Sequence, residues 1–325
     1  MTSAATNTFV VEGFALLGVS VLLVALRIKA RWIMVGWKDF QLDDYLMVLA
    51  AVVYGLETGA AYMVAEWFHG LANNCMTDRQ RANLSPDSDE YRWRVGGSKV
   101  QVVGWSLYVT TLWLLKACMA IFYARITGGL LYIRTRILIS YASIAVTYVV
   151  VLIVILAGCH PIHKNWQIYP DPGNHCQPAV AKIHIYFTVL LNVTTDIYLM
   201  SVPIPIIITS RMKWREKAPL IVLFSGGLFV ITAGILRCVG GANSAEEGAS
   251  WGRRESFVAV AIGNLPMIYP LVRRIARKAR SCVRQNISQS YPRYPLSDSA
   301  SQYHNHPVTQ SRDTERRHNV QELDP

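Results

Sequence analysis

The chain has 325 residues, of which 52% are apolar and only 16% are charged. Soluble domains carry about 25% charged residues, so this composition argues against a soluble protein. Lysine and arginine number 32 against 21 acidic residues, which gives a formal net charge of +11. In so apolar a chain, we expect this excess to orient helices in a lipid bilayer, and no nucleic-acid partner is predicted.

Seven apolar stretches are long enough to cross a bilayer, which takes about 20 mostly apolar residues in a helix. They span residues 9–26, 42–65, 100–124, 137–158, 183–209, 218–239 and 256–272. Prolines interrupt the fifth and the seventh stretch, but neighbouring helices in a bundle can satisfy the backbone groups that prolines free. No alternating barrel pattern is present, so the predicted fold class is all-α, a bundle of seven transmembrane helices.

The distribution of positive charge predicts the orientation of the bundle. The first, third and fifth loops and the twenty residues after the last stretch hold 17 lysines and arginines, against nine in the other loops. The positive-inside rule therefore places the N-terminus outside and the C-terminus in the cytoplasm, and we expect the plasma membrane. The predicted organisation is a short extracellular N-terminus (1–8), a membrane domain (9–272) and a cytoplasmic tail (273–325), basic at first and then polar and disordered from Ser281 onward.

Polar residues within the apolar stretches are the candidates for a ligand cavity or a polar network, because ionisable groups in a bilayer are costly and usually face the bundle interior. The candidates are Asp44, Glu57, Lys116, Asn192, Asp196 and Arg237. A helical rise of about 1.5 Å per residue places Glu57, Arg237 and Glu12 at one level near the outer side. Arg237 can therefore pair with Glu57 or with Glu12.

Lys116 falls in the inner half of the third stretch, where it can pair with Asp196 or Asp44. Asn192 lies one helical turn before Asp196, so several polar groups meet within a short segment of the fifth stretch. Such pairs can simply lock a bundle together, or they can line a hydrated cavity or form a switch network. Both interpretations stay open at this point.

Neither a cofactor nor a metal is predicted. The seventh stretch contains no lysine, so a retinal Schiff base has no nucleophile there. The loop after the fourth stretch contains Cys159, His160, His163, His175 and Cys176, but their spacing fits no standard zinc pattern. This loop lies on the predicted outer, oxidising side, which favours a disulfide instead.

Two disulfide pairings are possible among the three cysteines on the predicted outer side. Cys159 and Cys176 bracket a single loop and form the preferred pair. A bond between Cys75 and Cys176 would tether two different loops and remains the alternative.

Several long sequence blocks occur in order along most of the chain. They are LDDYLMVLA (42–50), GSKVQVVGWSLYVTTLWLLKACMAIFYARIT (97–127), GCHPIHKNWQIYPDPGNHC (158–176), NVTTDIYLMSVPIP (192–205), FSGGLFVITAGILRCV (224–239) and NLPMIYPLVRR (264–274). By these blocks the chain resembles the fungal rhodopsin-domain integral membrane proteins, a family that includes a satratoxin-cluster membrane protein and pathogenicity-related receptor-like proteins. The resemblance implies a receptor-like seven-helix bundle, and most of its motif positions coincide with the polar candidates above.

The resemblance and the polar candidates together suggest a function. We expect an orphan, G-protein-coupled-receptor-like sensor of a fungus that binds a small-molecule ligand from the outer side and acts on a cytoplasmic signalling partner. The alternative is a membrane-embedded enzyme or accessory protein of secondary-metabolite biosynthesis acting on a lipophilic intermediate. In that case Asp196 or Glu57 would serve as the general acid.

Overall fold

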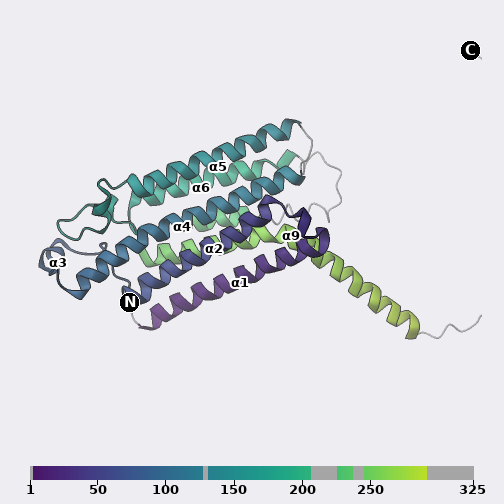
Figure 1. Cartoon of the computed structure of the whole chain (residues 1–325), viewed down its shortest axis with the longest axis horizontal. Coiled ribbons are helices and arrows are strands. Elements are labelled where there is room, and N and C mark those ends of the chain that lie inside the picture. The colour runs from purple at the N-terminus through teal and green to yellow at the C-terminus, as the bar shows by residue number, and fades with distance from the viewer. Residues whose placement is uncertain (1–2, 127–130, 206–224, 237–244, 291–325) are drawn as a thin grey trace, which may run out of the picture. The chain divides into compact units, whose positions relative to one another are not determined.

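The computed structural model describes residues 3–126, 131–205, 225–236 and 245–290, and over these ranges it contains helices and no strand. Six of the helices are long and apolar enough to cross a membrane. They are α1 (Ser3–Val35), α2 (Leu42–Tyr62), α4 (Asp89–Ile126), α5 (Leu131–Ala157), α6 (Lys182–Ser201) and α9 (Ala245–Ser290). Figure 1 shows α1, α2, α4, α5, α6 and the part of α9 up to Ala276 running side by side in a bundle. The chain is therefore an all-α, multi-pass integral membrane protein.

The seven predicted stretches correspond to the helices of this bundle, and the predicted fold class is confirmed. Six stretches coincide with the six long helices. The remaining stretch, 218–239, is described only over the short apolar helix Ser225–Leu236. The fifth stretch was predicted to reach residue 209, whereas α6 ends at Ser201. Pro203 and Pro205 have no backbone N–H to donate to the preceding turn, which agrees with an end of α6 just before them.

Local sequence sets the ends of the first two helices. Gly36 follows α1 with a φ of 80°, a conformation that costs glycine little, and its N–H donates to the Trp32 carbonyl at 3.0 Å. After a single turn (Trp37–Asp39), α2 begins with a reciprocal cap between Gln41 and Asp44. The Gln41 N–H donates to Asp44 Oδ2 at 3.2 Å. The turn between α1 and α2 therefore brings Asp44 to the start of α2, beside the end of α1.

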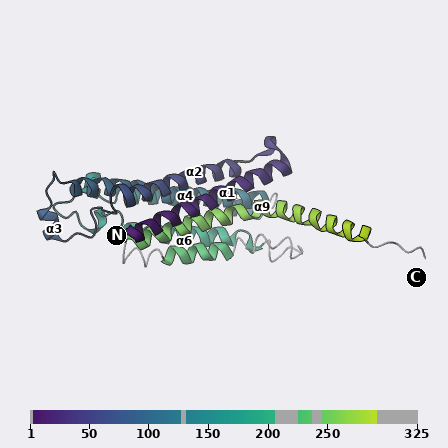
Figure 2. The same cartoon turned by 90° about the horizontal axis from the view of Figure 1, so that it is seen from below.

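Helix α4 occupies the centre of the bundle, where it packs against α2, α5 and α6, while α1 packs against α2. Figure 2 shows the helices from a second direction. The main core includes Trp113 of α4, Val151 of α5 and Leu199 of α6. Apolar side chains on the outside of the bundle, such as Leu22 and Ile153, are more than half exposed. This outward apolar surface is the one expected to contact lipid.

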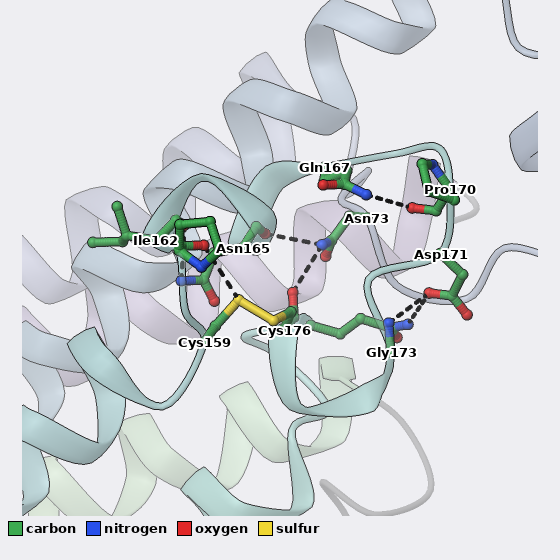
Figure 3. The surroundings of a disulfide bond; sticks show 11 residues. Asn73, Cys159, Ile162, Asn165, Gln167, Pro170, Asp171, Gly173 and Cys176 are labelled. Carbon is green, nitrogen blue, oxygen red and sulfur yellow. Dashed lines mark hydrogen bonds between the residues drawn. A yellow bond between two sulfur atoms is a disulfide. The ribbon is translucent and has the colours of Figure 1, made fainter.

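The loop between α5 and α6 is closed by the disulfide between Cys159 and Cys176, which confirms the preferred pairing. Cys75 is free and exposed. The tether between the two loops is made instead by Asn73, whose Nδ2 donates to the carbonyls of Asn165 at 2.9 Å and Cys176 at 3.0 Å (Figure 3). Hydrogen bonds from a buried amide thus join the two loops that the alternative disulfide between Cys75 and Cys176 would have joined.

Helix α9 is longer than its predicted stretch at both ends. It begins at Ala245 rather than at residue 256, and it continues through Ser281 to Ser290, where the polar composition predicted a disordered tail. The chain divides into two compact units, residues 1–276 and residues 277–325. The bundle belongs to the first unit, and the second is described only over its helical residues 277–290. The rest of the predicted tail lies outside the described residues.

Candidate functional site

A cavity of about 460 Å³ lies at the end of the bundle where α1, α4 and α9 begin and α2 ends. Its walls are mostly apolar, and the polar residues among them include Glu57 of α2, Tyr108 of α4 and Arg253 of α9. All three side chains are buried. The volume falls in the range of small-molecule sites, which combine apolar walls with a few polar groups.

Small side chains create the space for this cavity. The last turns of α2 present Ala60 and Ala61, and α4 faces them with Gly104. The segment after α2 then widens into one turn of π-helix, Met63–Trp67, which contributes two more lining residues. Single π-helical turns occur often at functional sites, because the extra residue displaces side chains from the regular helical register.

One glycine allows the cavity rim to approach α4 closely. A Cβ atom on Gly97 would lie 2.0 Å from the backbone oxygen of Leu71, a rim residue. Next to this contact, Arg94 donates to the Ala72 carbonyl at 2.8 Å and pairs with Glu90 at 2.8 Å. The rim is therefore held against α4 by backbone contact and by a charged side chain.

Tyr108 connects the cavity to a buried polar network. Its hydroxyl donates to Glu255 Oε2 at 2.7 Å, and the other oxygen of Glu255 accepts from Asn192 Nδ2 at 2.8 Å. Glu255 and Asn192 are both fully buried. A buried carboxylate needs such donors to offset its desolvation. Three helices, α4, α9 and α6, therefore meet at Glu255.

The network continues to Lys116, two helical turns beyond Tyr108 on the same face of α4. Lys116 Nζ donates to the Asn192 carbonyl at 3.1 Å and forms a close ion pair with Asp196. Asn192 and Asp196 are four residues apart and so share one face of α6. Of the two partners that the sequence allowed for Lys116, the structure brings Asp196 to it.

Asp44, the other possible partner, belongs to a charge cluster at the opposite end of the bundle from the cavity. It pairs with Arg27 at 3.1 Å and with Arg31 at 3.0 Å. Asp43 pairs with Arg27 at 2.6 Å and, more distantly, with Arg125 at 3.7 Å. Arg27 also donates to the Gly263 carbonyl of α9 at 3.1 Å. This cluster joins α1, α2, α4 and α9.

A family model, the fungal rhodopsin domain, matches residues 26–274. The chain belongs to the fungal rhodopsin domain family. The match covers most of the chain, including Lys116, Asn192, Asp196 and the cavity residue Glu57. Searches among curated proteins and among solved structures find no significant match.

In this fungal rhodopsin domain, the pairing of Lys116 with Asp196 is present, whereas Glu57 and Glu12 have partners other than the predicted Arg237. Glu57 accepts weakly from Ser256 Oγ at 3.3 Å. Glu12 pairs with Arg254 at 2.6 Å, a partner that the sequence had not suggested. Arg237, the partner predicted for both acids, lies outside the described residues.

Sequence reasoning missed three buried residues of the fungal rhodopsin domain: Arg27, Arg253 and Glu255. Arg27 was counted as a loop charge because α1 was expected to end at residue 26, nine residues before its actual end. The other two were assigned to a loop before the seventh stretch. Acidic residues in a first helical turn are a start signal, and Glu246 and Glu247 provide one at the true start of α9.

Proposed function

We propose that this protein is a receptor-like sensor, in which a small molecule enters the cavity and alters the packing of α4, α6 and α9. The observation that supports this function is the position of Tyr108, which lines the cavity and also donates to Glu255. A ligand that displaces the Tyr108 hydroxyl changes the hydrogen bonding of a carboxylate shared by two other helices. Differential ligand contact with two arrangements of a bundle is what a binding-driven switch requires.

The orientation proposed from the positive charges places ligand binding and signalling on opposite sides of the membrane. The cavity is then open to the outer side, and the cluster around Arg27 and Asp44 lies at the cytoplasmic end. The cytoplasmic signalling partner is proposed to bind at that end, where α9 carries the exposed basic residue Arg274. The plasma membrane is the proposed location, because an extracellular ligand is then accessible.

Occupation of the cavity can be tested without the natural ligand, because exposed Cys75 lines it. Pyrene maleimide attached to Cys75 places an aromatic group at the cavity, and hydrogen–deuterium exchange then reports the response of α6 and α9. We expect altered exchange around Asn192 in the parent protein and a much smaller change in Tyr108→Phe. Tyr148→Phe is the matched control, since Tyr148 is hydrogen-bonded to Thr110 outside the network.

The sensor proposal fails if labelling changes exchange only in the cavity walls, or if Tyr108→Phe responds like the parent. Cys75→Ser treated with the same reagent corrects for labelling at other cysteines. A uniform change in every helix would indicate general destabilisation and would also contradict the proposed switch.

The cavity leaves Glu57 as the one general acid of the two that the enzyme alternative had considered. A general acid has to reach the substrate directly or through one water. Glu57 lines the cavity, whereas Asp196 is absent from its walls and is paired with Lys116. An enzyme would therefore depend on Glu57, and Glu57→Gln would abolish a product in metabolite profiles of a complemented deletion strain. An unchanged profile in the deletion strain itself would eliminate this alternative.

A further inference from the structure

Arg253 is a buried cation in the wall of the cavity, with 4% of its surface exposed. Its Nη1 donates to the Phe9 carbonyl at 2.9 Å, and its guanidinium carbon lies 3.6 Å from the centroid of the Phe9 ring. One end of the guanidinium is thus fixed to α1 by a hydrogen bond and a cation–π contact. The side chain is positioned rather than free to reach solvent.

The other edge of the same guanidinium has no hydrogen-bond partner. Among the described residues, neither Nε nor Nη2 of Arg253 contacts an acceptor, and both atoms are covered by protein, so a ligand reaches them when neighbouring side chains move aside. Its neighbour Arg254 is paired with Glu12, and buried Arg27 is bound by two aspartates. Leaving charged donors buried and unsatisfied is costly, so such an edge calls for an explanation. Nε and Nη2 point the same way in the guanidinium plane and form a fork that matches the two oxygens of a carboxylate.

The surroundings of Arg253 determine what kind of carboxylate fits. Apolar and aromatic surface from Val64, Val100 and Trp105 forms much of the wall. Gln101 adds a buried Oε1 without a partner, which could accept from a ligand hydroxyl or amide. Glu57 is an acidic residue in the same wall, and it accepts from Ser256 Oγ at 3.3 Å rather than from the Arg253 guanidinium.

We infer that the cavity binds an organic acid, whose carboxylate is held by Nε and Nη2 of Arg253 and whose apolar body lies against Val64, Val100 and Trp105. This inference rests on the proposed sensor function and names the ligand class for its site. A long-chain or aromatic monocarboxylic acid satisfies both parts of the cavity, whereas a neutral lipid or a cation leaves the arginine fork without an acceptor.

The test uses two fluorescent compounds that differ only in the head group, pyrenebutanoic acid and pyrenebutanol. The full chain in lipid nanodiscs is titrated with each, and empty nanodiscs correct for partitioning into lipid. The acid is expected to bind the parent protein at least about tenfold more tightly than the alcohol, as charge-assisted hydrogen bonds contribute more than neutral ones. Arg253→Gln should remove this difference, and Arg253→Lys, which keeps the charge without the fork, should remove most of it.

Matched variants separate the inference from the proposed function. Arg254→Gln changes the adjacent, already paired arginine and should leave both affinities unchanged. Unchanged binding of the alcohol shows that Arg253→Gln is folded. Two cavity-filling variants, Ala249→Trp at the exposed rim and Gly104→Leu in the wall, should weaken both compounds together.

The remaining outcomes refute either the organic-acid inference alone or the inference together with the sensor site. Equal affinities for acid and alcohol, or an acid affinity that survives Arg253→Gln, would refute the organic-acid inference. If the cavity-filling variants then still weaken both compounds, the cavity remains a ligand site and the sensor proposal stands. If neither compound binds, or if the cavity-filling variants leave binding unchanged, both the inference and the sensor site are refuted.

Discussion

Removing one partner of the buried pair between Lys116 and Asp196 should destabilise the bundle far more than removing both. Only 6% of the Lys116 side chain and 14% of the Asp196 side chain are exposed. Breaking a buried ion pair on one side typically costs about 3–5 kcal/mol, because the remaining charge has lost its partner. In Asp196→Leu, Lys116 keeps the Asn192 carbonyl and lies 5.8 Å from the Trp113 ring, so we expect the lower limit of about 3 kcal/mol.

Lys116→Met should cost at least as much as Asp196→Leu. Lys116 is the donor to Asp196 Oδ1, and Oδ2 has no hydrogen-bond partner in the described structure. The double variant replaces the pair by apolar side chains and should recover most of the loss, with a coupling energy of about 2 kcal/mol or more. A loss of 3 kcal/mol lowers the melting temperature of a domain of this size by roughly 6–12 °C.

The assay is the loss of the monomer peak in size-exclusion chromatography after heating in detergent, measured for the parent, both single variants and the double variant. Arg92→Met is the control, since Arg92 and Asp89 form an ion pair at 3.7 Å with both side chains more than 70% exposed. It should shift the melting temperature little. If the effects of Lys116→Met and Asp196→Leu simply add in the double variant, the two residues are not coupled and the network ends at Asn192.

Three further predictions concern Gly97, Cys75 and Arg27. Gly97→Ala should destabilise the protein by about 1–3 kcal/mol, because its Cβ would lie 2.0 Å from the Leu71 backbone oxygen, and an unchanged melting temperature would contradict that close approach. Exposed Cys75 should react with a membrane-impermeant maleimide on intact cells, and labelling of the parent that equals that of Cys75→Ser would contradict the proposed orientation. Arg27→Leu should cost about 3–5 kcal/mol by leaving Asp43 and Asp44 with weaker donors, and Arg27→Leu that melts like the parent would show that Arg31 and Arg125 compensate.

The all-α fold and the six long membrane helices could be predicted from the sequence because a bilayer imposes a length and an apolar composition on each span. The residues at which the helices begin and end were harder to predict, since a membrane helix can continue past its apolar part at little cost in free energy. Arg27 and Glu255 illustrate this, because each lies within a helix just beyond the apolar stretch that was predicted. Hydropathy marks the lipid-contacting core of a helix and not its full length.

The inner part of the candidate site was predicted better than the outer part. Lys116 and Asp196 are isolated charges in strongly apolar stretches, so few partners were available to either. Arg253 and Arg254 are adjacent, and the sequence alone did not indicate that one would be buried against Phe9 and the other paired with Glu12. Which of two neighbouring charges turns inward depends on the helix rotation, and this is set by packing across the whole bundle.

The order of synthesis gives the ion pair between Lys116 and Asp196 a further consequence. Asp196 follows Lys116 by 80 residues, so α4 is complete well before its counter-charge exists. At about 5–20 residues per second the delay is roughly 4–16 s, during which a lysine in the inner half of a span costs up to about 3 kcal/mol on insertion scales. Efficient membrane integration of α4 therefore depends on the helices that follow it, and truncation of the chain before α6 should leave α4 poorly inserted at the translocon.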